Sequence, residues 1–167
     1  MVQLIDKYQK KSPPMRRLFY FRYTMKKKSS SVKIILGEFD KGGVHLFLNL
    51  KVNGIKCRFL IDTGASKSVL DKKYFEEKVG KKYIKTIKQE TTGLHSSTSE
   101  SHYGTIKTIE LGHHVIKNYS IAAIDLSHVN MVYKQAKKPK INGILGSDLM
   151  LKYKMIVDYG QLKIYLP

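Results

Sequence analysis

Short apolar runs with the length and composition of β-strands dominate the chain from residue 32 onward. Residues 32–37 and 44–52 are rich in Val, Ile, Leu and Phe, which favour strands. Asn53-Gly54 separates the second run from a third at residues 55–61, and this dipeptide is the strongest short signal for a β-hairpin. The pattern therefore predicts a hairpin whose second strand ends immediately before Asp62.

The rest of the chain reads as further strands joined by polar loops and short helices. Residues 71–79, followed by Gly80, predict a short helix with a glycine stop. Extended segments are predicted at 82–88, 105–112 and 119–126, and two more strands surround a turn at Tyr159-Gly160. The remaining predictions are a polar loop at Thr91 to Tyr103, a basic connector at Lys134 to Lys140, and a short helix capped by Ser147 or Asp148. The fold class predicted is mainly β, with one or two short helices.

Residues 1–31 differ from the rest and are predicted to form a basic, flexible N-terminal arm. Serine and proline interrupt this segment, which shows no helix or strand period; it reads as an arm or as residues upstream of a start at Met25. Its apolar cluster at 18–23 contains an arginine and falls short of the apolar stretch of about 7 to 15 residues in a signal peptide. No run reaches the roughly 20 apolar residues of a membrane span. We therefore predict a cytoplasmic protein with one folded domain at residues 32–167.

Composition adds a strong positive charge to this picture. The 167 residues include 31 Lys and Arg against 13 Asp and Glu, a net charge of +18, and 42% hydrophobic residues argue for a folded chain. Such a charge favours acidic partners and weak, non-specific contact with polyanions. The lysine runs lack the interleaved aromatic residues of a platform for single-stranded nucleic acid. Cys57 is the single cysteine, which excludes an internal disulfide, and its apolar neighbours predict a buried side chain.

The stretch FLIDTGASKSVLD, residues 59–71, holds the strongest candidate for chemistry. A carboxylate at the end of a buried strand is costly to ionise without partners, so Asp62 needs a physical reason to be there. The same motif, together with the distant Ile144-Leu145-Gly146, resembles the retropepsin-like aspartic proteases, and in particular their bacterial single-domain members. The resemblance covers residues 32–167 and implies a closed β-barrel or sandwich. It also implies an aspartic endopeptidase that hydrolyses polypeptides and needs no cofactor.

The resemblance assigns catalysis to Asp62, Thr63 and Gly64. Two close carboxyl groups can share one proton, so that one accepts a proton from water while the other donates one. Because the chain has a single Asp-Thr-Gly, the second carboxylate must come from a second copy, which predicts a homodimer. The residues expected to support the site are Ala65, Ser66, Ile144, Leu145 and Gly146. A flap over the substrate is expected at Thr92, Gly93, Leu94 and His95.

Other kinds of site find less support in the sequence. His95, His102, His113 and His114 lie close together but lack the spacing and companion ligands of a zinc site, so no metal is expected. No serine or cysteine hydrolase signature occurs. The main rival is a protein of the same fold that does no proteolysis and acts as a basic binding module for nucleic acid or acidic proteins. The intact Asp-Thr-Gly favours the protease, and the charge of +18 favours the binding module.

Overall fold

The computed structural model describes residues 30–39, 42–90 and 98–166. Most of the predicted arm and all four predicted flap residues, Thr92 to His95, lie outside these ranges. The first strand begins at Ser30, two residues before the predicted start of the domain. None of the helices in the described ranges is long and apolar enough to cross a membrane.

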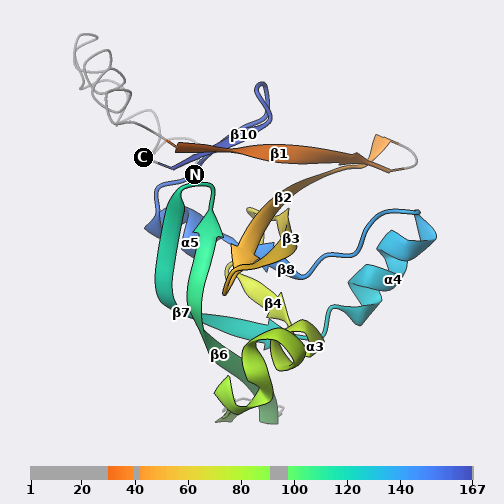
Figure 1. Cartoon of the computed structure of the whole chain (residues 1–167). Coiled ribbons are helices and arrows are strands. Elements are labelled where there is room, and N and C mark those ends of the chain that lie inside the picture. The colour runs from red at the N-terminus through yellow and green to blue at the C-terminus, as the bar shows by residue number, and fades with distance from the viewer. Residues whose placement is uncertain (1–29, 40–41, 91–97, 167) are drawn as a thin grey trace, which may run out of the picture. The chain divides into compact units, whose positions relative to one another are not determined.

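Ten strands form most of the fold (Figure 1). They are β1 (Ser30–Glu38), β2 (Val44–Val52), β3 (Ile55–Ile61), β4 (Val69–Asp71), β5 (Ile84–Glu90), β6 (Thr98–Leu111), β7 (His114–Ile124), β8 (Gly143–Leu145), β9 (Ile156–Asp158) and β10 (Lys163–Leu166). The helical segments are α3 (Lys72–Tyr74), the π-helical η2 (Phe75–Gly80), the 3₁₀-helical η3 (Lys81–Tyr83), α4 (Ser127–Gln135) and α5 (Ser147–Lys152). The prediction of a mainly β fold with short helices is confirmed.

Six of the strands close into a barrel. Around it the order is β2, β3, β8, β4, β7 and β6, and β6 pairs back onto β2 through Lys51 with Glu110 and Val52 with Ile109. Asn53-Gly54 joins β2 to β3 as predicted, and both residues have positive φ, as this hairpin turn requires. β1 continues the sheet beyond β2 to β10 and β9, while β5 pairs with β6 on the other side.

Alternation along the strands places one set of side chains inside the barrel. Leu46, Leu48, Phe59, Ile61 and Leu145 belong to the main core cluster and are almost fully buried. Cys57 belongs to the same cluster and is 3% exposed, which confirms its predicted burial. On the other face of the sheet a smaller cluster of Phe47, Leu126, Tyr133 and Ile141 forms under α4 and is joined by Leu60 and Ile144. The residues on either side of Leu60 therefore face the barrel core, while Leu60 itself faces the second cluster.

Several predicted elements differ from the structure. Residues 127–135 form α4, which the sequence did not reveal, so the predicted connector at 134–140 begins inside a helix. Residues 98–103 belong to β6 and not to a loop, because they pair with β5. The predicted helix at 71–79 is α-helical only at 72–74 and continues as the π-helical η2 to Gly80. Asp125 follows β7 and accepts a hydrogen bond from the Ser127 amide at the start of α4, where a strand had been predicted.

Candidate active site

Asp62 directly follows β3, at the point where the chain leaves the sheet. Its amide donates to the carbonyl oxygen of Leu145 over 3.0 Å, which continues the pairing of β3 with β8 by one residue. Its Oδ1 accepts a hydrogen bond from the amide of Gly64 at 2.9 Å. Asp62 is partly exposed, while Thr63 and Gly64 are exposed. The carboxylate is thus oriented by its own turn and open to solvent on the side away from the core.

The predicted supporting segment lies beside this turn. β8 is inserted between β3 and β4, so that Ile144 pairs with Leu60 in parallel and with Val69 in antiparallel fashion (Figure 1). The chain leaves β3 at Asp62, passes around the end of β8 and returns as β4. The structure therefore brings together Asp62 to Ser66 and Ile144 to Gly146, which are distant in the sequence.

Backbone contacts fasten these two segments to each other. The amide of Ser147 donates to the carbonyl oxygen of Ala65 at 2.8 Å. The Ser147 hydroxyl donates to the carbonyl oxygen of Thr63 at 2.7 Å. Gly146 lies in the space between them, where a Cβ would fall 2.9 Å from the Ala65 carbonyl oxygen. Ser66 is exposed, and no side-chain hydrogen bond of Ser66 is found within the described residues.

Asp148 has a different position from the one predicted. The N-cap position of α5 is occupied by Gly146, which has no side chain to cap the helix. The Oδ1 of Asp148 instead accepts from the amide and hydroxyl of Ser68, at 2.8 and 2.6 Å, and its Oδ2 accepts from the Tyr119 hydroxyl at 2.9 Å. These contacts link α5 to the loop after Asp62 and to β7. The predicted cap position is therefore corrected: Ser147 and Asp148 both lie inside the first turn, where Asp148 Oδ1 also accepts from the amide of Leu149 at 2.8 Å.

The other aspartates of the described chain bind amides in nearby turns, and Asp71 also accepts from the distant amide of Leu126 at 3.2 Å. Asp71 accepts from the amide of Tyr74 at 2.8 Å, Asp125 from that of Ser127 at 2.8 Å, and Asp158 from that of Gln161 at 2.8 Å. Within the described ranges, no second carboxylate forms a hydrogen bond with Asp62. The described part of one copy therefore offers a single acid at this site.

A small apolar cluster that the sequence did not predict packs against Leu60 and Ile144, in the strands β3 and β8 that lead to the Asp62 turn. Tyr133 of α4 is 2% exposed, packs in one cluster with Leu60 and Ile144, and shares a 2.9 Å hydrogen bond with Nδ1 of His45. Burial, with a further contribution from the negative charge of Asp62, raises the pKa of Tyr133. α4, a helix whose short apolar pattern gave no sequence signal, thus packs against the two strands that lead to the Asp62 turn.

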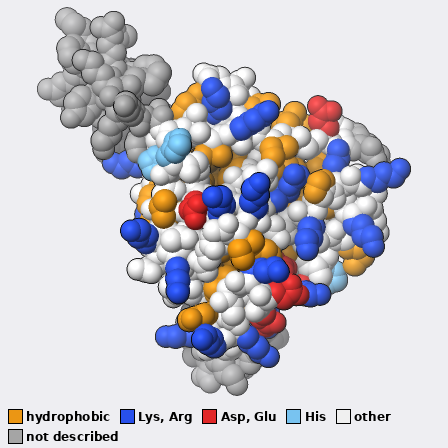
Figure 2. Space-filling view, in the orientation of Figure 1, with side chains coloured by type: hydrophobic (Ala, Val, Ile, Leu, Met, Phe, Trp, Pro, Cys, Tyr) orange, Lys and Arg blue, Asp and Glu red, His pale blue; other side chains and the backbone are white. Residues whose placement is uncertain are grey.

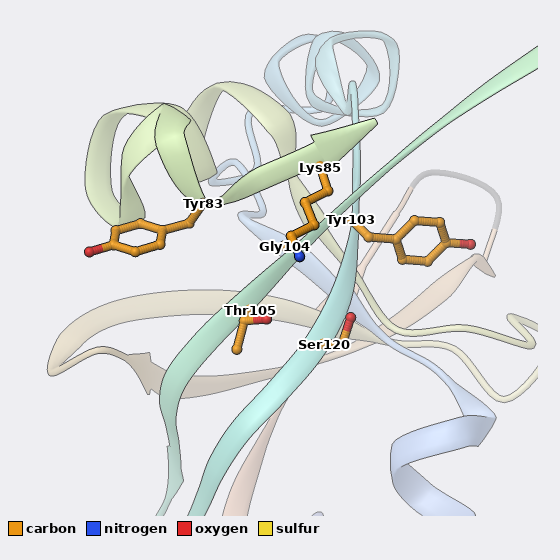
Figure 3. Close-up of a pocket in the computed structure, with 6 residues that line it drawn as sticks. All are labelled: Tyr83, Lys85, Tyr103, Gly104, Thr105 and Ser120. Atoms are coloured by element: carbon orange, nitrogen blue, oxygen red, sulfur yellow. The ribbon is translucent and has the colours of Figure 1, made fainter. Parts of the chain in front are cut away.

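A shallow hollow of about 270 Å³ lies where β5, β6 and β7 run side by side (Figure 3). In this view Lys85 lies between Tyr83 and Tyr103, with Thr105 and Ser120 below them. The β5–β6 hairpin leads from here into the predicted flap, whose tip lies outside the described residues. Of the four histidines weighed for a metal site, His102 instead contacts Lys72 Nζ at 3.1 Å and Thr86 Oγ1 at 3.0 Å.

Comparison with known proteins gives a consistent set of matches. The sequence profile of the family described as aspartyl protease matches residues 48–149, more than half of the chain. No curated protein sequence matches the chain.

Among solved structures, a retropepsin-like aspartic protease from Rickettsia conorii is 22% identical with a TM-score of 0.48; the match covers 83% of this chain and 94% of that one. The retroviral protease-like domain of Ddi1 from Leishmania major is 16% identical, also with a TM-score of 0.48, and covers 74% and 94%. The EIAV protease in complex with the inhibitor HBY-793 is 22% identical, with a TM-score of 0.38, and covers 64% and 85%.

Proposed function

The chain belongs to the aspartyl protease family, and from this premise we propose that it is a homodimeric aspartic endopeptidase whose catalytic acids are the two copies of Asp62. The observation that carries the proposal is the setting of this carboxylate. It ends a barrel strand, is oriented by the Gly64 amide, and has no acidic partner within the described residues. Because catalysis in this family uses a pair of acids, the second carboxylate must be the Asp62 of another copy of the chain.

The chemistry follows from one proton shared by two carboxyl groups. The ionised Asp62 accepts a proton from a water molecule, whose oxygen attacks the carbonyl carbon of the peptide bond, while the protonated Asp62 of the other copy donates its proton to the carbonyl oxygen. The resulting tetrahedral intermediate breaks its C–N bond as the first Asp62 passes the proton it took from the water to the amide nitrogen, while the second Asp62 takes a proton back from a hydroxyl of the intermediate, which restores the pair. The two apparent pKa values belong to the pair, so activity should follow a bell between acidic and neutral pH.

An edge strand and exposed apolar side chains support self-association. β9 ends the order of strands, so one of its sides is unpaired in the described chain. Three large apolar side chains lie in the same C-terminal segment: Leu151 is 81% exposed, Ile156 58% and Tyr159 67%. Exposed edge strands and apolar patches are common sites of pairing with another chain. We assign the dimer contact to this segment, which the sequence alone did not identify.

The assignment can be tested with one pair of variants. Ile156→Lys should weaken self-association in sedimentation experiments and lower activity at low protein concentration, with recovery at high concentration. Val132→Lys is the matched control, because Val132 is also 58% exposed but lies on α4. If both variants dimerise equally well, the assignment of the dimer contact to the C-terminal segment is wrong.

The activity itself is tested by incubating a peptide library with the wild type and with Asp62→Asn. Removing a general acid or base typically lowers a rate by about 10² to 10⁴-fold, so the variant should lose cleavage while keeping the circular dichroism spectrum of the wild type. Asp125→Asn is a matched control, since Asp125 is exposed and accepts from the Ser127 amide at the start of α4. Full activity in Asp62→Asn, or no cleavage by the wild type, would end the protease proposal.

We assign the activity to residues 32–167 and none of it to the arm. A chain that begins at residue 30, where β1 begins, should keep the wild-type kcat and KM. The polypeptide substrate remains a proposal, and the cytoplasmic location remains a prediction from the sequence.

The charge distribution favours a second candidate, a basic binding module. Figure 2 shows Lys and Arg spread over the visible face with few acidic side chains among them. In the described part of the chain, one ion pair is formed, between Lys51 and Glu110 at 3.3 Å. The candidate predicts that fluorescence anisotropy with a labelled oligonucleotide detects binding that weakens steeply with salt. Tight binding by Asp62→Asn, with no cleavage by the wild type, would favour this candidate over the protease.

A further inference from the structure

The side chains of Tyr119, Asp148 and Ser68 form a continuous hydrogen-bonded chain behind the Asp62 turn. Tyr119 belongs to β7, Asp148 to the first turn of α5, and Ser68 ends the loop that starts at Asp62. The Asp148 carboxylate accepts four hydrogen bonds: two from Ser68, one from Tyr119, and one from the amide of Leu149 at 2.8 Å. A single carboxylate thus connects three elements of the barrel.

Ser68 passes this connection on to the end of β8. It is 1% exposed, and its hydroxyl, which donates to Asp148, accepts from the amide of Gly146 at 2.9 Å. Gly146 in turn lies against the backbone of Ala65 and Lys67. Residues 62–68 contain no regular secondary structure, so contacts of this kind determine where the loop lies. Both ends of the loop are therefore held: by Leu145 at Asp62 and by Asp148 at Ser68.

The hydrogen bonds also determine the charge of Asp148. Burial by itself would raise the pKa of this carboxyl, but the bonds from the Ser68 hydroxyl, the Leu149 amide, Tyr119 and the Ser68 amide outweigh it, and the pKa is lowered. Burial and the charge of Asp148 in turn raise the pKa of Tyr119, so Tyr119 remains a donor. The other titratable groups nearby are Tyr153 and Lys152. The Nζ of Lys152 lies 5.3 Å from the centre of the Tyr119 ring and 5.7 Å from the centre of the Tyr153 ring.

We propose that Asp148 is a positioning residue of the active site: through Ser68 it fixes the loop that carries Asp62 and takes no proton during catalysis. This inference rests on the proposed function. Asp62 and Asp148 then have different roles. Asp62 must exchange a proton with the Asp62 of the other copy, while Asp148 stays ionised and fully hydrogen-bonded. Catalytic groups must be held to within about 0.5 Å, and a misplacement of about 1 Å can cost about 10²-fold in rate.

The kinetic test compares Asp148→Asn and Tyr119→Phe with the wild type over the pH range of activity. Asp148→Asn should lower kcat by about tenfold to a hundredfold with KM almost unchanged, because the substrate contacts remain but the acids are displaced. Tyr119→Phe removes one donor from the carboxylate and so raises its pKa; the acidic limb of the kcat profile should move to higher pH. Asp125→Asn is the matched control, because that carboxylate also accepts from an amide at a helix start but is exposed.

A second measurement does not depend on proteolysis. The Gly64 amide is held by Asp62 Oδ1, so its hydrogen exchange reports how well the turn is ordered. Exchange at Gly64 should accelerate in Asp148→Asn and Ser68→Ala, and stay at the wild-type rate in Asp125→Asn. If the wild type cleaves no peptide but Gly64 exchange accelerates, the protease proposal fails and the positioning role stands. Unchanged Gly64 exchange, or a lower melting temperature with an unchanged kcat profile, would overturn the positioning role.

Discussion

Gly146 lies so close to Lys67 that a Cβ placed on Gly146 would fall 2.6 Å from the Lys67 carbonyl carbon. The neighbouring atoms are backbone and cannot rotate away, so one of the two segments would have to move. The contact thus fixes the distance between the end of β8 and the loop that follows Asp62.

Gly146→Ala should therefore destabilise the fold and remove activity. Overpacking of this kind costs about 1–3 kcal/mol, which chemical denaturation can measure. Gly160→Ala is the control, since its Cβ would meet only the Asp158 Oδ1, at 3.4 Å. Equal free energies of unfolding for the two variants would show that the loop containing Lys67 can shift at little cost.

Gly64→Ala should behave in the opposite way. A Cβ at Gly64 would contact only Asp62 Oδ1, at 3.2 Å, so the single chain has room for it after a small shift. We expect the free energy of unfolding of the monomer to change by less than about 1 kcal/mol. Close approach of two copies at this turn would be obstructed, so sedimentation should show a weaker dimer and the activity should fall. A dimer of wild-type affinity would contradict a close approach of the two copies at Gly64.

Stability should depend on pH through Asp148. Its pKa is lower in the folded chain than in the unfolded one, so its contribution is present above the unfolded pKa and disappears as pH falls through the folded pKa. Asp148→Asn should thus be less stable than the wild type near about pH 6, and the difference should shrink below about pH 4. Urea unfolding at several pH values measures this. A difference that stays constant into strong acid would contradict it.

Cys57 should resist alkylation in the folded chain. Burial raises the pKa of this thiol, more than its hydrogen bond to Tyr74 lowers it, so little thiolate forms at mildly alkaline pH. The Sγ contacts the Tyr74 hydroxyl at 2.9 Å and is shielded from reagents. Iodoacetamide labelling, followed by mass spectrometry, should be about 10²-fold slower than in guanidinium chloride. Labelling at the same rate in both conditions would mean that the thiol is accessible.

The sequence predicted those elements that depend on neighbouring residues, such as turns and alternating strands. The Asn53-Gly54 hairpin and the strand that ends at Asp62 appear where the sequence placed them, because turn residues and apolar alternation specify both. The resemblance to aspartic proteases is confirmed by the family match. The functional roles of the site residues remain predictions.

The missed features depend on contacts between distant parts of the chain. α4 has one almost fully buried residue, Tyr133, and so lacks the apolar stripe that reveals a helix. Residues 98–103 are polar, yet they form a strand because their backbone pairs with β5. Asp148 follows the pattern of a helix cap and does accept from the Leu149 amide, but Ser68 and Tyr119, neither of them near it in the sequence, also bind its carboxylate.

β8 can take its place between β3 and β4 only after residues 62–142, which separate it from β3 in the sequence, have been synthesised. A ribosome that has just released Asp62 must still add the residues up to Gly146 before the strand beside it exists. Parallel pairing across such a separation also forms late, because closing the intervening loop costs entropy before any contact compensates for it. The nascent chain therefore carries Asp62 well before it carries the strand beside it, and the surroundings of this carboxylate are complete only after residues 143–146 have been made.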